Sequence, residues 1–134
     1  MRFRGLSVLM LLLVGLAGCS LEYPIDLKFK WELKRGEMKW ADNSGPNKNR
    51  KINVTATTSP SGNEIIVAAV LVDDLEATKE QMRKGGEPPK YLAYHPGGAK
   101  VDLEFVIAAK TPFVVVVKNI AEESTEVDLK IKSK

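Results

Sequence analysis

Residues 27–34 read Leu-Lys-Phe-Lys-Trp-Glu-Leu-Lys, an unbroken alternation of apolar and charged side chains. Successive side chains of a β-strand point to opposite faces, so this spacing places the apolar residues on one face and the charged residues on the other. A helix would scatter both sets around its circumference. The segment therefore predicts a strand with one face on a hydrophobic core and the other face in solvent.

The same alternation recurs in three later segments, at 52–57, 101–107 and 126–132. Two other segments, Ile65–Val72 and Phe113–Val117, are apolar without interruption, which predicts strands that are buried on both faces. An ordinary sandwich buries only one face of each sheet, so these two strands carry more apolar surface than one core needs. We expect another part of the chain, a partner protein or an apolar ligand to cover that surface.

One helix is predicted at Leu75–Lys84, after Asp73 as a capping residue with Glu76 three positions on, and before Gly85 as a stop signal. Leu75 and Met82 stand seven residues apart and so share one face of this helix. The predicted helix is close in sequence to the apolar strand 65–72. We therefore favour this helix, or the long loops, over a partner protein or an apolar ligand as the cover of the excess apolar surface.

About seven short strands separated by turns, with one helical connection, favour a mainly all-β protein. We expect a single antiparallel β-sandwich domain over residues 27–134. One more short strand is expected at Lys90–His95, followed by a turn at 96–98. Residues 100–132 are faintly similar to the final strands of emp24/GOLD-like small sandwiches, through a strand, a Pro-led apolar strand ending at Asn119 and a closing strand. No function is carried over from that similarity.

The first residues of the chain combine basic and apolar character. Arg2 and Arg4 precede an apolar stretch at Leu6–Leu16, which is too short for a membrane span of roughly 20 residues. Leu16-Ala17-Gly18-Cys19 follows directly, and Cys19 is the sole cysteine of the chain. This arrangement is typical of an export signal that ends at a cysteine.

Residues 1–20 resemble the lipobox signal of bacterial lipoproteins. The resemblance implies that residues 1–18 are a signal peptide that is removed, that Cys19 receives a covalent lipid such as palmitate, and that residues 19–26 form a lipidated tether. Ser20 stands where an inner-membrane retention signal usually has Asp. The resemblance therefore implies an exported, membrane-anchored protein, on the outer membrane facing the periplasm if the host is Gram-negative.

Composition argues against several classes of function. The formal charge of +3 falls further when Arg2 and Arg4 leave with the signal, so no basic field is expected to attract nucleic acid. A lipidated Cys19 leaves no thiol for a disulfide, a metal or catalysis. His95 is the single histidine, and no serine lies in a Gly-x-Ser-x-Gly elbow. We therefore predict a protein that is not an enzyme and has no metal or cofactor beyond the lipid.

Two groups of residues remain as candidate sites. Aromatic and amphipathic side chains are favoured at interfaces, so Trp40, Tyr91, Tyr94 and His95 are a candidate interface. The predicted function is a lipid-anchored extracytoplasmic binding or accessory protein of the bacterial cell envelope, with an envelope protein as its partner. The acidic pairs 73–74 and 122–123 keep an alternative open, a small envelope hydrolase or a calcium-dependent carbohydrate-binding module.

Overall fold

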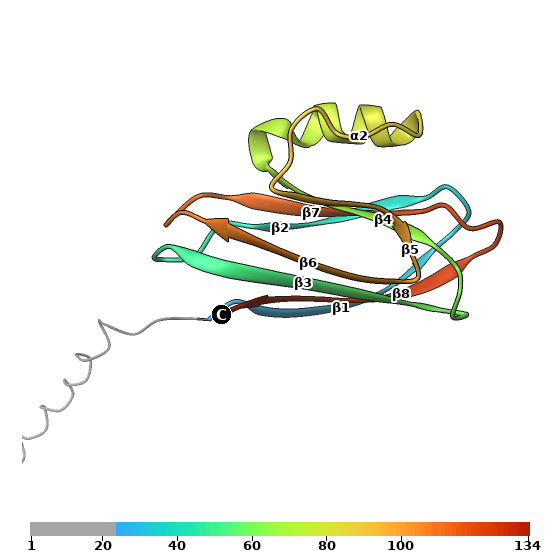
Figure 1. Cartoon of the computed structure of the whole chain (residues 1–134), viewed down its shortest axis with the longest axis horizontal. Helices are drawn as coiled ribbons and strands as arrows, with labels where there is room; N and C mark the ends of the chain where they lie inside the picture. The colour runs from blue at the N-terminus through green and yellow to red at the C-terminus, as the bar shows by residue number, and fades with distance from the viewer. Residues whose placement is uncertain (1–23) are drawn as a thin grey trace, which may run out of the picture.

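The computed structural model describes residues 24–134, so the predictions for residues 1–23, including the lipid at Cys19, lie outside the described residues. Two four-stranded antiparallel sheets pack face to face, and one helix lies on the second sheet (Figure 1). The first sheet has the order β1-β8-β3-β6 and the second β2-β7-β4-β5. The strands are β1 Asp26–Leu33, β2 Met38–Asn43, β3 Arg50–Ser59, β4 Ile65–Leu71, β5 Ala93–Gly98, β6 Lys100–Ile107, β7 Phe113–Asn119 and β8 Thr125–Ser133.

The predicted antiparallel β-sandwich is confirmed, with eight strands in place of about seven. The additional short strand is β5, and its position corrects the sequence analysis in one respect. It begins at Ala93 and runs through residues 96–98, which we expected to form a turn. The register shifts here, because Ile65 pairs with Gly98 and Val67 with His95, so β5 carries one extra residue opposite this part of β4. Because β5 is an edge strand, Pro96 can lie in it without breaking a ladder on both sides.

The first sheet is buried on one face, as the alternating segments predict. Leu33, Val54 and Leu129 contribute fully buried side chains to the core between the sheets. Charged residues alternate with them and lie on the opposite face in solvent, as the burial patterns of β6 and β8 show.

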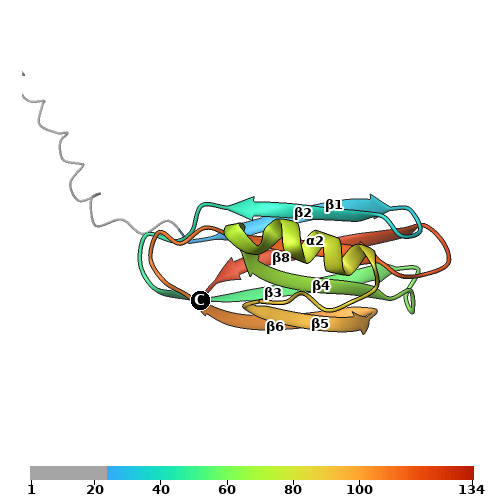
Figure 2. The ribbon, with the colours of Figure 1, turned by 90° about the horizontal axis from the view of Figure 1, so that it is seen from above.

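The second sheet is buried on both faces, because the helix α2 (Leu75–Arg83) covers its outer side (Figure 2). Val115 and Val117 of β7 belong to the core between the sheets, whereas Val114 and Val116 lie in a second cluster with Met82 of the helix. Full burial of one such side chain contributes about 1.5–3 kcal/mol, so this cover is comparable with the whole stability of a domain. The expectation that the helix covers the excess apolar surface is confirmed.

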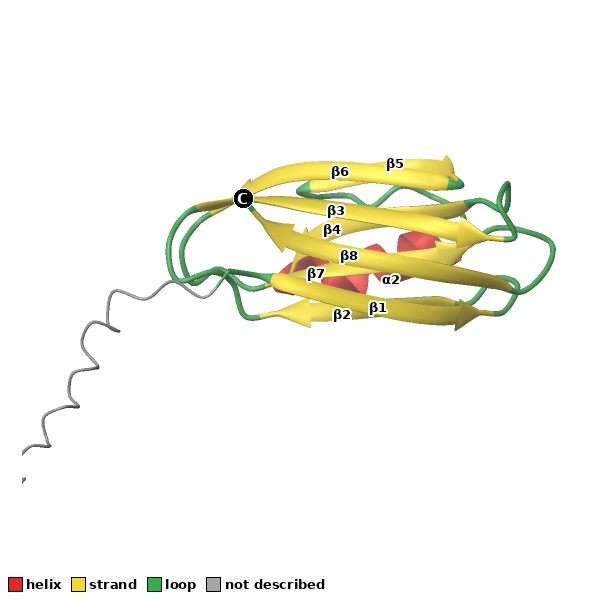
Figure 3. Cartoon of the chain, turned by 90° about the horizontal axis from the view of Figure 1, so that it is seen from below, coloured by secondary structure: helices red, strands yellow, loops and turns green. Residues whose placement is uncertain are grey.

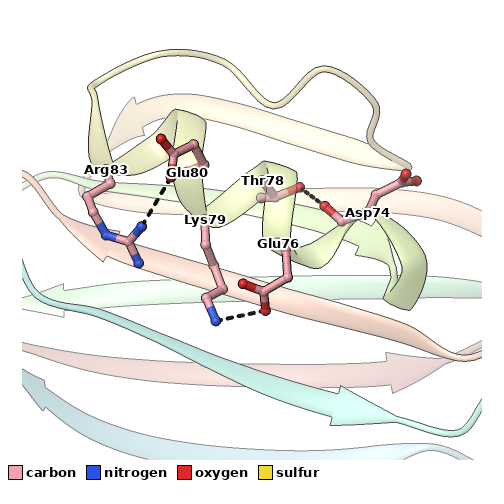
Figure 4. A network of polar contacts seen from close by, with 6 residues as sticks. All are labelled: Asp74, Glu76, Thr78, Lys79, Glu80 and Arg83. Atoms are coloured by element: carbon pink, nitrogen blue, oxygen red, sulfur yellow. Dashed lines mark hydrogen bonds and ion pairs between the residues drawn. The ribbon is translucent and has the colours of Figure 1, made fainter.

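The start of α2 differs from the predicted capping box. A 3₁₀ turn, η2 (Val72–Asp74), precedes the helix, and Asp74 rather than Asp73 occupies the position before its first residue, with no side-chain capping bond. Instead, the buried Thr78 donates its hydroxyl proton to the Asp74 carbonyl oxygen at 2.8 Å (Figure 4). The predicted stop is confirmed: Gly85 has a φ of +84°, a conformation that favours glycine.

We refer to the two ends of the sandwich as the Ile25 end and the far end. At the Ile25 end, the Ile25 amide donates to the Ser133 hydroxyl oxygen, and the Ser133 amide donates to the Ile25 carbonyl oxygen, both at 2.9 Å. The loops 44–49 and 108–112 close the same end. Gly45, with a φ of +99°, approaches Thr111 so closely that an added Cβ would lie 2.4 Å from its carbonyl oxygen.

The far end holds the turns 34–37, 59–64 and 120–124, and a buried amide ties two of them together. The Asn119 amide nitrogen donates to the carbonyl oxygens of Leu33 at 3.0 Å and Glu123 at 2.9 Å. Its side-chain oxygen accepts from the Ala121 amide at 2.9 Å. The position of both turns is therefore fixed from inside. Within residues 24–134, no helix has the length and apolarity that a bilayer crossing requires.

Candidate functional site

The structure divides the four candidate interface residues between separate places. Trp40 and Tyr94 lie in one row across the second sheet, on its two edge strands, with Val116 and Ala68 between them. The helix α2 lies above the middle of this row. Three strand spacings of about 4.8 Å separate the two rings, so they cannot contact the same small ligand group.

Tyr91 and Tyr94 form a pair on the β5 side of the helix. Their ring centroids are 5.3 Å apart, with Tyr91 exposed and Tyr94 packed against the cluster beneath the helix. The negative charge of Glu87, together with a hydrogen bond to it, raises the pKa of Tyr91 above its ordinary value of 10.0. Burial is the first cause of the raised pKa of Tyr94. Both phenols are therefore neutral hydrogen-bond donors near neutral pH.

His95 does not join this pair, because neighbouring side chains of a strand point to opposite faces. It stands opposite Val67, a residue of the core between the sheets, whereas Tyr94 stands opposite Ala68 beneath the helix. The His95 Nδ1 accepts a hydrogen bond from the Gly97 amide at 3.2 Å. The histidine side chain therefore accepts a hydrogen bond within its own strand, β5.

Trp40 belongs to a different feature, which we call the edge hollow. It is lined by Trp31, Met38, Lys39 and Trp40 and has a volume of about 220 Å³. The hollow lies where the edge strands β1 and β2 of the two sheets run side by side (Figure 3). The opposite side of the sandwich is bounded by β5 and β6.

Neighbouring side chains hold both tryptophans of the edge hollow in place. The Lys79 ammonium lies 4.2 Å from the Trp40 ring centroid and also contacts a Glu76 carboxylate oxygen at 3.1 Å (Figure 4). Only 16% of the Lys79 side chain is exposed, so this cation–π contact is partly shielded from water. Phe29 packs beside Trp31 with ring centroids 5.3 Å apart. The hollow therefore has aromatic walls that neighbouring side chains pack against, and 39% of Trp40 is exposed.

Sequence reasoning placed Trp31 in the core and missed its part in this hollow. The side chain is partly buried and packs against the core, but it also lines the hollow. Its strand, β1, is the edge of the first sheet, so one flank of the inward-facing ring has no neighbouring strand to cover it. The alternation of 27–34 indicates which way the ring faces, but it does not indicate which strand lies at the edge.

The acidic pairs do not come together. Asp73 lies at the Ile25 end, beside Thr111 and Pro112, whereas Glu122 and Glu123 line a hollow at the far end. Glu122 also forms an ion pair with Arg35 at 3.3 Å. In the described part of the chain, no three His, Asp, Glu or Cys side chains gather in a group that could hold a metal ion.

Comparison with protein-family models and with curated proteins gives no match. Solved structures are similar in fold. The pre-peptidase C-terminal domain of a Bacillus anthracis collagenase has a TM-score of 0.60 at 13% identity and covers 81% of this chain and 90% of its own. The mitogen derived from Yersinia pseudotuberculosis has a TM-score of 0.54 at 6% identity, covering 84% and 88%.

A periplasmic inhibitor of g-type lysozyme, PliG from Aeromonas hydrophila, is also similar to this chain. It has a TM-score of 0.50 at 8% identity and covers 82% of this chain and 87% of its own. At such low identities these similarities identify the class of fold, a β-sandwich.

Proposed function

We propose that this protein is a lipid-anchored, extracytoplasmic binding protein of the bacterial cell envelope, and that it binds a protein partner at the edge hollow without catalysing a reaction. The edge hollow is the observation that carries the proposal. Tryptophan is enriched among the residues that dominate binding energy at protein interfaces, particularly in pre-formed pockets. Here two tryptophans line one hollow. Lys79 packs on Trp40, and Phe29 packs beside Trp31.

The chemistry of the hollow favours binding over catalysis. Lys39 is the one ionisable residue among its four lining residues, so the hollow itself supplies no acid and base at a shared point. Its volume of about 220 Å³ suits one or two partner side chains rather than a large ligand. Among the proteins of similar fold, PliG is described as a lysozyme inhibitor, which is a binding role on a sandwich of this kind.

The anchor is the second part of the proposal and rests on the lipobox resemblance at Cys19. A covalent lipid would keep the domain close to one membrane and raise its effective concentration for other envelope components. Replacing Cys19 by Ala should abolish incorporation of labelled palmitate and release the protein from the membrane fraction. Unchanged labelling and fractionation would refute the anchor.

The partner site is tested by site-specific cross-linking of the full-length protein in its own host. A photo-reactive residue at Lys39 should yield one defined cross-linked protein. The same residue at Val106, which is 67% exposed on β6, is the matched control and should not yield it. Trp40→Ala and Trp31→Ala should weaken the cross-link at position 39, whereas Tyr91→Ala should leave it unchanged.

The cross-linking result separates this function from the alternative one. Equal yields at positions 39 and 106, or yields that are insensitive to Trp40→Ala, would refute binding at the hollow. A clear rise in thermal midpoint with calcium or with sugars would instead favour a carbohydrate-binding or hydrolytic role.

A further inference from the structure

Lysines gather at the Ile25 end of the molecule, on the outer face of the first sheet and the adjoining loop. Cross-strand register places Lys28 opposite Lys130 and Asp26 opposite Lys132, while the Lys134 amide donates to the Lys51 carbonyl oxygen. We call the exposed lysines of this region the basic corner: Lys28, Lys51, Lys110, Lys130, Lys132 and Lys134. The acidic residues among them are Asp26, Asp102 and Glu104, and Glu104 forms an ion pair with Lys134.

The far end has the opposite character. Glu32 and Glu126 face one another across β1 and β8, and further glutamates follow in the turns. These are Glu37, Glu64, Glu122 and Glu123, accompanied by the basic residues Lys34, Arg35, Lys100 and Lys118, so that acidic residues outnumber basic ones here. The domain therefore carries basic charge at one end and acidic charge at the other, although its overall charge is close to balanced.

The remaining acidic residues of the Ile25 end lie on the other side of the molecule. Asp42 belongs to β2 of the second sheet, while Asp73 and Asp74 lie in η2 before the helix. The side of this end that carries the first sheet is therefore basic, and the side that carries the helix is acidic.

The pair Lys28–Lys130 is a second, independent observation. Like charges directly opposite on neighbouring strands destabilise a sheet. The nearby Asp128 is already in an ion pair with Lys30 at 3.6 Å, and the uncharged Thr55 stands on the other side of Lys130. A hollow of about 350 Å³ lies beside the two lysines. An anionic group placed there would offset their repulsion.

The position of the chain's entry into the domain indicates which anion meets this corner. Ile25 is hydrogen-bonded to Ser133 at the basic end, and Ile25 is the sixth residue after Cys19. Fully extended, six residues span at most about 20 Å. A lipid at Cys19 would therefore hold Ile25 at most about 20 Å from the bilayer surface. Any shorter span of the tether lets the lysines of the basic corner approach the surface to within the Debye length of about 8 Å at physiological salt.

We infer that the basic corner is a second membrane contact, which binds the phosphates of anionic lipid headgroups and fixes the orientation of the domain. This inference rests on the proposed lipid anchor at Cys19. Basic residues next to a lipid anchor strengthen attachment to anionic bilayers. Trp31 and Met38 belong to the halves of β1 and β2 nearer the far end, so this orientation leaves the edge hollow facing away from the bilayer.

The experiment measures lysine acetylation in the purified lipidated protein, anchored on vesicles of phosphatidylcholine alone or with added phosphatidylglycerol. Mass spectrometry gives the acetylation rate of each lysine on the two surfaces. On the anionic vesicles we expect rates several-fold lower at Lys51, Lys110 and Lys132, and unchanged rates at Lys34 and Lys84. High salt should remove the difference, because it screens the attraction.

Paired variants sharpen this test. Lys51→Glu combined with Lys132→Glu should abolish the protection of Lys110, since each basic residue near an anionic surface changes partitioning roughly five-fold. Lys34→Glu combined with Lys84→Glu is the matched control at exposed lysines outside the corner and should leave that protection intact. Normal flotation with equal acetylation rates on both vesicles would overturn the membrane contact alone. Failure to float with the phosphatidylcholine vesicles would overturn the anchor and this contact together.

Discussion

The outer faces of the two sheets differ in side chains and in exposure to solvent. On the second sheet, Val114 and Val116 point away from the sandwich core and are buried beneath α2. On the first sheet, the equivalent outward positions of β6 and β8 carry charged residues in solvent, except for the exposed Val106. The difference shows that a strand's sequence reports both of its faces, and that a continuous apolar run requires a third layer.

A charge introduced beneath the helix should reduce the stability of the domain most. Val116→Asp places a charge among fully buried apolar side chains beneath the helix and should destabilise the domain by more than about 4 kcal/mol. Lys130→Asp is the matched change on the open face and should alter stability by less than about 0.5 kcal/mol, since it also creates a partner for Lys28. Urea unfolding of both variants measures the contrast, and similar midpoints would contradict it.

The packing of the helix against the second sheet should also contribute to the stability of the domain. Met82 is fully buried against the second sheet, so Met82→Ala should cost about 2–5 kcal/mol through lost burial and a cavity. Arg83→Ala, one residue further on, removes an exposed side chain that forms an ion pair with Glu80 at 3.7 Å and should cost less than about 0.5 kcal/mol. Equal losses in urea unfolding would show that the helix does not seal the outer face.

A smaller effect is expected where the covered face meets the edge hollow. Lys79→Gln removes the cation above Trp40 and should cost about 0.5–1 kcal/mol of stability. A double-mutant cycle with Trp40→Leu isolates this contact, and Lys84→Gln is the control at the exposed lysine that follows the helix. A coupling energy of zero would mean that the lysine does not hold the ring.

The smallest effect lies on the open face. The Lys134 ammonium holds the pKa of Glu104 below its ordinary value of 4.5, first through a hydrogen bond and then through its charge. The carboxylate therefore contributes stability above pH 4.5, and this contribution is lost as the pH falls through the lowered pKa. Glu104→Gln should flatten the unfolding midpoint against pH in that acidic range. An unchanged profile would show that this exposed pair has no effect on stability.

The sequence predicts which face of each strand is buried better than it predicts which strands lie next to one another. The alternation of β1, β6 and β8 indicates their buried sides correctly, and the apolar runs of β4 and β7 indicate that a cover is needed. Strand order is set by contacts between distant segments, so local periodicity does not reveal that β1 and β2 are edges. Because the sequence does not show that β1 is an edge strand, it does not predict that Trp31 is only partly covered, or that the edge hollow exists.

Two local errors have equally specific causes. Pro96 argued against a strand, yet an edge strand paired through a register shift accommodates it. The carboxylate at position 73 argued for a helix cap, yet a 3₁₀ turn moves the helix start by one residue. In both cases tertiary geometry overrides a local signal that is sound on average. The candidate residues Trp40, Tyr91 and Tyr94 remain predictions, now assigned to two opposite edges of the second sheet.

The direct continuation of the chain from Ile25 into β1 has a mechanical consequence. The chain enters the domain directly into β1, and Trp31 of the edge hollow lies on that same strand. A force applied at Ile25 and resisted at Trp31 is carried along covalent bonds of one extended segment. The interstrand ladders and the helix bear little of that load, so tension between these two points does not unzip the sandwich.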